Sequence, residues 1–121
     1  LIGLFGCGGD RDRTKRPLMG AAAAKFCHEV IVTSDNPRTE DPEQIIQDIL
    51  KGLASHDSVT TEVDRPTAVR SVLAKLRPGD VLVMAGKGHE DYQEIRGVKH
   101  PMDERVLIAE VLEELRENAR A

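Results

Sequence analysis

The chain has few aromatic residues: one tyrosine, two phenylalanines and no tryptophan among 121 residues. Its core must therefore be built from valine, isoleucine, leucine and alanine. An aliphatic core favours layered α/β architectures over an aromatic-rich β sandwich. Hydrophobic residues make up 40% of the chain and charged residues 31%, which is typical of a globular domain rather than a disordered segment.

Cysteines are few, and there is no excess of positive charge. Cys7 and Cys27 are too few and too far apart for a disulfide framework or a zinc site, which predicts reduced thiols. With 17 basic and 21 acidic residues, the net charge of -4 gives no reason to expect a nucleic-acid or acidic-membrane partner. No apolar run approaches the roughly 20 residues of a membrane span, and no signal peptide is recognisable. We therefore expect a cytoplasmic protein.

Hydrophobic periodicity predicts strands alternating with helices. We expect strands at residues 1–6, 28–34, 59–63 and 80–86, and helices at 18–26, 41–53, 66–76 and from about 102 onward. Residues 93–101 are predicted to form a short strand or hairpin near an edge. This order indicates a single domain, residues 1–121, of the α/β class, Rossmann-like, with three layers and a mostly parallel sheet.

The helix at 41–53 has a clear predicted start. Asp41 can serve as its N-cap, Pro42 suits the first helical position, and Gln44 completes a capping-box pattern. Because Asp41 already caps this helix, Asp35 is not needed for that purpose.

Three polar loops directly follow predicted strands. They read "GCGGDRDRTKRP", "SDNPRTE" and "GKGHED". Ligands of parallel α/β sheets bind beyond the carboxyl ends of the strands. We therefore expect all three loops to emerge at one edge of the sheet and to form the binding site there.

The first loop resembles a nucleotide-binding fingerprint, but its glycine spacing departs from G-x-G-x-x-G and it contains no P-loop pattern. Its backbone amides can still cradle an anion. The loop also carries four long basic side chains that add cationic reach toward such an anion: Arg11, Arg13, Lys15 and Arg16. The alternative interpretation is a solvated loop.

In the second loop, Arg38 can hold a carboxylate through two parallel hydrogen bonds, and Asn36 can donate to the same group. Asp35 can accept a hydrogen bond from an ammonium group. Pro37 would fix the loop before a ligand arrives. The alternative here is ordinary turn chemistry, in which Asp or Asn precedes proline.

The third loop brings Glu90 near the other two. Two acids, Asp35 and Glu90, and two arginines, Arg11 and Arg38, would then line one cleft. A ligand that carries ammonium and carboxylate groups at one end fits this set, whereas a phosphate ligand would be repelled by the two acids.

The motifs "GCGGDRD…KRPLMG", "VTSDNPRTEDP", "AGKGHEDYQ" and "DER" resemble the C-terminal domain of the Mur ligases, in particular the members that add diaminopimelate. The likeness runs from about residue 1 to residue 115. It implies an ATP-dependent amide ligase of peptidoglycan biosynthesis, in which this domain delivers the amino acid. The family's first strand of the domain is expected to be missing from this chain.

The resemblance also assigns residues. It implies that meso-diaminopimelate is bound by Arg11, Asp35, Asn36, Pro37, Arg38, Gly86 and Glu90. No catalytic or metal-binding residue is expected in this chain. ATP and Mg²⁺ would bind mainly outside it, and UDP-N-acetylmuramoyl-L-alanyl-D-glutamate would be held by the missing domains. The central ATPase domain of the same protein would be its partner, and the chain alone is expected to be inactive.

Two alternatives remain open from the sequence. One is a Mur ligase that adds lysine instead of diaminopimelate. The other is a non-catalytic Rossmann-like module that binds a dinucleotide or another anion, which the glycines after the first strand favour and the acids in the cleft oppose.

Overall fold

Four short strands form a parallel sheet in the computed structural model, which describes residues 1–9, 11–85 and 92–120. Their order is β3-β2-β1-β4, so β1 lies between β2 and β4. The strands are β1 (Ile2–Phe5), β2 (Glu29–Val32), β3 (Val59–Thr61) and β4 (Leu82–Met84). Every neighbouring pair is parallel, and Leu4 is in register with both Ile31 and Met84. The predicted parallel sheet is confirmed.

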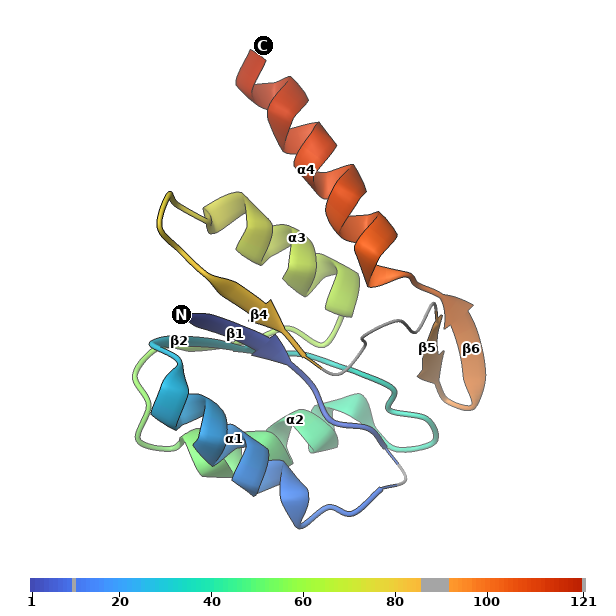
Figure 1. Cartoon of the computed structure of the whole chain (residues 1–121). Helices are drawn as coiled ribbons and strands as arrows, with labels where there is room; N and C mark the ends of the chain where they lie inside the picture. The colour runs from blue at the N-terminus through green and yellow to red at the C-terminus, as the bar shows by residue number, and fades with distance from the viewer. Residues whose placement is uncertain (10, 86–91, 121) are drawn as a thin grey trace.

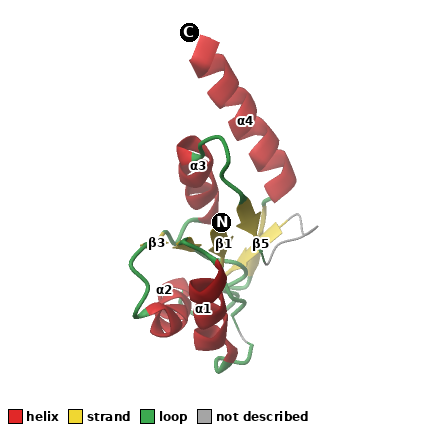
Figure 2. Ribbon diagram, turned by 60° about the vertical axis from the view of Figure 1, so that its left-hand side comes forward, coloured by secondary structure: helices red, strands yellow, loops and turns green. Residues whose placement is uncertain are grey.

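Helices cover both faces of the sheet (Figures 1 and 2). On one side lie α1 (Lys15–Phe26) and α2 (Pro42–Leu50), the latter followed by the 3-10 turn η1 (Lys51–Leu53). On the other side lie α3 (Arg65–Lys75) and α4 (Glu104–Arg120). The predicted three-layer arrangement is therefore present, and α4 extends beyond α3 toward the C-terminus.

The core consists of one apolar cluster on each face of the sheet. Successive side chains of a strand point to opposite faces. In β2, Val30 and Val32 pack with Ile45 and Ile49 of α2, whereas Ile31 packs on the opposite face. Both faces of β1 and β2 are thus buried, which is why these two strands read as apolar runs in the sequence.

The helix starts follow the predicted capping chemistry, with two differences. Asp41 Oδ1 accepts a hydrogen bond from the Glu43 N–H at 3.0 Å, so the predicted N-cap is confirmed. Gln44, expected to complete a capping box, donates its side-chain amide to Asp48 at 3.0 Å. Helix α1 begins at Lys15 rather than at residue 18, since the first turn of a helix needs no N–H from Pro17.

Residues 92–101 form an antiparallel hairpin of their own, β5 (Tyr92–Ile95) and β6 (Val98–Pro101), separate from the parallel sheet. Its turn residues, Arg96 and Gly97, have φ values of 52° and 77°, the left-handed pair typical of two-residue hairpin turns. The hairpin lies on the side of the molecule toward which the strands of the sheet point (Figure 1).

Candidate functional site

The loops that follow β1 and β2 are in direct contact. The Gly9 N–H donates to the carbonyl oxygen of Asn36 at 2.7 Å. A Cβ atom on Gly9 would lie 1.8 Å from the carbonyl oxygen of Pro37, so only glycine allows this approach. The prediction that these two loops share one edge of the sheet is confirmed.

The two predicted arginines lie beside one glycine. A Cβ atom on Gly8 would be 2.8 Å from Arg38 Nη1 and 3.5 Å from Arg11 Cγ. Arg38 Nη1 donates to the carbonyl oxygens of Gly9, at 3.0 Å, and Asn36, at 3.3 Å. Both bonds come from the same one of the three guanidinium nitrogens, and they orient the group. A guanidinium has five N–H donors in total, spread over the three nitrogens.

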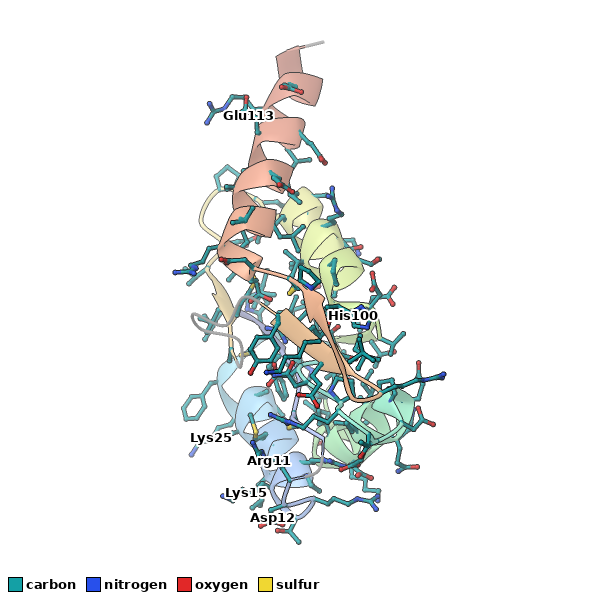
Figure 3. The ribbon with its side chains drawn as sticks, turned by 90° about the vertical axis from the view of Figure 1, so that its right-hand side faces the viewer. Arg11, Asp12, Lys15, Lys25, His100 and Glu113 are labelled. Atoms are coloured by element: carbon teal, nitrogen blue, oxygen red, sulfur yellow. The ribbon has the colours of Figure 1, made fainter. Side chains whose placement is uncertain are left out.

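A pocket of about 420 Å³ opens next to this cluster, at the carboxyl end of β1. Arg11, Lys15, Asp12 and Asp35 are among its lining residues, so it presents both charges. Figure 3 shows Arg11, Asp12 and Lys15 together at the start of α1. A pocket of this size and mixed charge suits a small zwitterion better than a polyphosphate.

The second loop is fixed by the β5–β6 hairpin. Asn36 is 2% exposed, and its Oδ1 accepts a hydrogen bond from the Glu94 N–H at 2.8 Å. The Arg38 N–H donates to the Glu94 carbonyl at 2.9 Å, and the Gly97 N–H donates to the Arg38 carbonyl at 3.2 Å. Arg38 itself has a left-handed backbone, with a φ of 54°. A backbone angle this uncommon in a non-glycine residue is often found at binding sites.

Arg16 borders the pocket, but its guanidinium is paired inside the protein, so the prediction that it adds cationic reach is wrong. It is 1% exposed and donates to Asp48 at 2.9 Å, to Glu40 at 2.8 Å and to the Gly8 carbonyl at 3.3 Å. Its position in the first turn of α1 turns the side chain toward α2, where Asp48 supplies a buried counter-charge. Arg16 therefore braces the first loop against the second.

Asp48 is a buried carboxylate that remains ionised. Its burial raises the pKa, but hydrogen bonds from Arg16, Gln44 and Arg13 outweigh that effect and lower the pKa to about 2. The opposite applies to Cys7 in the pocket wall, where burial raises the pKa of the thiol. Cys7 is thus a neutral thiol near neutral pH and is not poised as a nucleophile.

One feature of the sequence indicates this buried network, although the loop motif that contains Arg16 does not include it. Asp48 lies three residues after Ile45 and one before Ile49, on the apolar stripe of α2. A carboxylate on a buried stripe needs a cationic partner inside the protein. The basic residues of the first loop were the available candidates.

Two of the predicted binding residues, Gly86 and Glu90, lie outside the described residues. The flanking Ala85 is described, and its N–H donates to the Leu4 carbonyl at 3.0 Å, so the end of β4 lies directly beside β1. The assignment of Gly86 and Glu90 to the site stays a prediction.

Within residues 1–9, 11–85 and 92–120, no three His, Cys, Asp or Glu side chains are grouped so that they could hold a metal ion. In the same ranges, no helix combines the length and the apolar character needed to cross a bilayer.

Comparison with known proteins defines the class. Residues 1–88 match the family model described as "Mur ligase, glutamate ligase domain". Together with the parallel three-layer fold, this match shows that the chain belongs to the Mur ligase family. A similar curated protein is the UDP-N-acetylmuramoyl-L-alanyl-D-glutamate–2,6-diaminopimelate ligase of Aquifex aeolicus, 52% identical over 112 residues. The protein of the same name from Synechococcus elongatus is 55% identical over 105 residues.

The chain corresponds to only part of these relatives. The matches cover 93% and 87% of this chain but 23% and 21% of the two proteins. A solved structure of a UDP-N-acetylmuramoyl-L-alanyl-D-glutamate–2,6-diaminopimelate ligase superimposes with a TM-score of 0.89 at 48% identity, over 95% of this chain and 24% of that one. The chain thus spans about a quarter of the length of the relatives that it matches.

Proposed function

We propose that this chain is the amino-acid-binding domain of an ATP-dependent ligase that joins meso-diaminopimelate to UDP-N-acetylmuramoyl-L-alanyl-D-glutamate in cytoplasmic peptidoglycan biosynthesis. The observation that carries the proposal is the placement of Arg11 and Arg38 beside Gly8, next to a pocket that Arg11 and Asp35 line. Three relatives that are 50–55% identical over the matched residues are named for diaminopimelate.

The charges of the pocket explain how the two candidate amino acids would be distinguished. Diaminopimelate carries an additional carboxylate at the end of the chain where lysine has only an ammonium group. Arg38, oriented by the backbone of the first loop, can bind that carboxylate with Arg11 nearby. Asp35, and Glu90 as predicted, would accept hydrogen bonds from the adjacent ammonium. Lysine would leave the two arginines without a carboxylate partner. Because unpaired charges in a desolvated site are costly, the site would reject lysine strongly.

The ATP and Mg²⁺ of such a ligase do not fit the residues described here. The first loop lacks a P-loop pattern, no metal-ligand group was found in the described ranges, and the pocket contains acids that would repel phosphates. We assign both to the remaining domains, including the central ATPase domain, which would also hold the UDP-linked dipeptide. The contribution of this chain is to hold the attacking amino group in place, which lowers the barrier by positioning.

The proposal is tested with the full-length protein that contains this chain. Phosphate release is measured with ATP, Mg²⁺ and UDP-N-acetylmuramoyl-L-alanyl-D-glutamate, in the presence of either meso-diaminopimelate or L-lysine. We expect release to depend on diaminopimelate, with lysine at least about 100-fold poorer in kcat/KM. Equal or better use of lysine would support the lysine-adding alternative. No ligation with either amino acid, together with binding of a nicotinamide cofactor, would support the dinucleotide-binding module.

A further inference from the structure

Arg65, the first residue of α3, is fully buried and has no part in the pocket described above. It is 0% exposed, and its guanidinium faces Glu104 at the start of α4, which is 6% exposed. Arg65 Nε donates to Glu104 Oε2 at 2.6 Å and Nη2 donates to Oε1 at 3.2 Å. This is a two-point ion pair, which fixes the plane of the guanidinium.

The other side of the guanidinium holds the ends of two strands. Arg65 Nη1 donates to the Ser34 carbonyl at 3.0 Å, and Nη2 donates to the Ala85 carbonyl at 3.1 Å. Ser34 directly precedes Asp35, and Ala85 directly precedes Gly86. Because β2 and β4 lie on opposite sides of β1, the guanidinium spans the end of the central strand.

Only an arginine can make this set of contacts. Its planar fork presents several N–H groups in fixed directions, whereas a lysine has one compact ammonium group. The two carbonyls need such a partner because they lie where the strands end, and buried backbone acceptors are seldom left without one. Glu104 belongs to the "DER" motif, which the proposed function leaves without a role.

We propose that Arg65 is a positioning residue for amino-acid binding: it ties the Ser34 carbonyl, next to Asp35, to the Ala85 carbonyl at the end of β4, and Glu104 holds it in the required plane. The inference rests on the proposed function, in which the loops that follow these two residues contact the amino acid. Displacing reacting groups by about 1 Å can cost as much as 100-fold in rate, so the spacing of these loops matters.

The experiment compares two variants of the full-length enzyme. Arg65→Lys keeps the charge beside Glu104 but cannot reach both carbonyls. Glu104→Gln weakens the ion pair but leaves Arg65 beside them. We expect Arg65→Lys to raise the KM for diaminopimelate about tenfold or more, with the KM values for ATP and the UDP-linked dipeptide within about twofold. Glu104→Gln should lower the melting temperature but change the KM for diaminopimelate much less.

A matched control is available on the same two helices. Arg70 of α3 pairs with Glu114 of α4 at 2.7 Å, with both side chains about half exposed. Replacing both by glutamine removes an α3–α4 ion pair without touching either loop, and all KM values should stay within about twofold, as expected for an exposed pair.

The outcomes separate the inference from the function it rests on. If the KM for diaminopimelate rises in both Arg65→Lys and Glu104→Gln in proportion to their loss of stability, the positioning role is overturned. If Arg65→Lys does not fold, the double variant Arg65→Gln/Glu104→Gln, which leaves neither charge of this buried pair in place, is measured instead. If the wild-type enzyme prefers lysine, the proposed function fails, and the same comparison with the KM for lysine still decides the role of Arg65.

Discussion

Arg38 reaches from the loop after β2 to the loop after β1, where its Nη1 donates to the carbonyl oxygen of Gly9 at 3.0 Å. The same two loops are joined by the Gly9 N–H and the Asn36 carbonyl at 2.7 Å. The guanidinium is therefore oriented by main-chain atoms before any ligand is present. Preorganisation of this kind lowers the entropy lost on binding.

Gly9→Ala should force the two loops apart, because the new Cβ atom would lie 1.8 Å from the Pro37 carbonyl oxygen. We expect a loss of about 1–3 kcal/mol in the free energy of unfolding, as for other overpacked sites. The full-length variant should also bind diaminopimelate more weakly. Denaturant titration and the KM for diaminopimelate measure the two effects.

Gly8→Ala is the control for that variant. A Cβ atom on Gly8 meets Arg38 Nη1 at 2.8 Å, the far end of a flexible side chain that can move aside. Its stability should therefore change by less than about 1 kcal/mol, while displacement of the guanidinium raises the KM for diaminopimelate. Equal destabilisation by both substitutions would contradict the loop geometry described here.

The Asp48 carboxylate makes stability depend on pH at the acid end. Its pKa is lowered from 3.8 to about 2 in the folded chain. A carboxyl group whose pKa is lower in the folded chain stabilises the folded state at every pH above its pKa in the unfolded chain. This contribution is lost as the pH falls from about 4 to about 2. We expect its size to be roughly 2 to 2.5 kcal/mol.

The measurement is the free energy of unfolding of the wild type and of Asp48→Asn between pH 2 and pH 7. The difference between the two should be largest near neutral pH and should shrink below about pH 4. A difference that stays constant down to pH 2 would mean that Asp48 is not the group that titrates.

The 121-residue chain alone should release no phosphate from ATP, even with Mg²⁺, the UDP-linked dipeptide and diaminopimelate all present, because the proposed phosphate and metal sites lie in other domains. The phosphate assay used for the full-length protein provides the measurement, with that protein as the positive control. Turnover by the isolated chain would place the catalytic machinery within these residues.

The sequence was sufficient for the fold because local and global signals agree. The apolar strand at residues 1–6 and the capped helix after Asp41 both appear where expected. The hairpin also forms, as a separate sheet that anchors Asn36. That anchoring could not be predicted, because contacts between distant segments leave no periodic pattern in the sequence.

The same reason explains what was missed at the site. The sequence singled out the exposed or loop residues Arg11, Asp35 and Arg38, since loops after parallel strands are natural binding positions. Asp48 on the apolar stripe of α2 did call for a buried cation. The sequence did not indicate that Arg16 is that cation or that Arg65 is buried, because their partners are up to 39 residues away along the chain.

The most direct test of the account compares Arg38→Gly with Arg96→Gly in the full-length enzyme. Both arginines have left-handed backbones, with φ values of 54° and 52°, so glycine removes a similar strain at each position. The measured quantity is the ratio of kcat/KM for meso-diaminopimelate to that for L-lysine. The account predicts that Arg38→Gly lowers this ratio by about 100-fold or more, while Arg96→Gly leaves it unchanged. An unchanged ratio in Arg38→Gly would show that Arg38 does not recognise the second carboxylate.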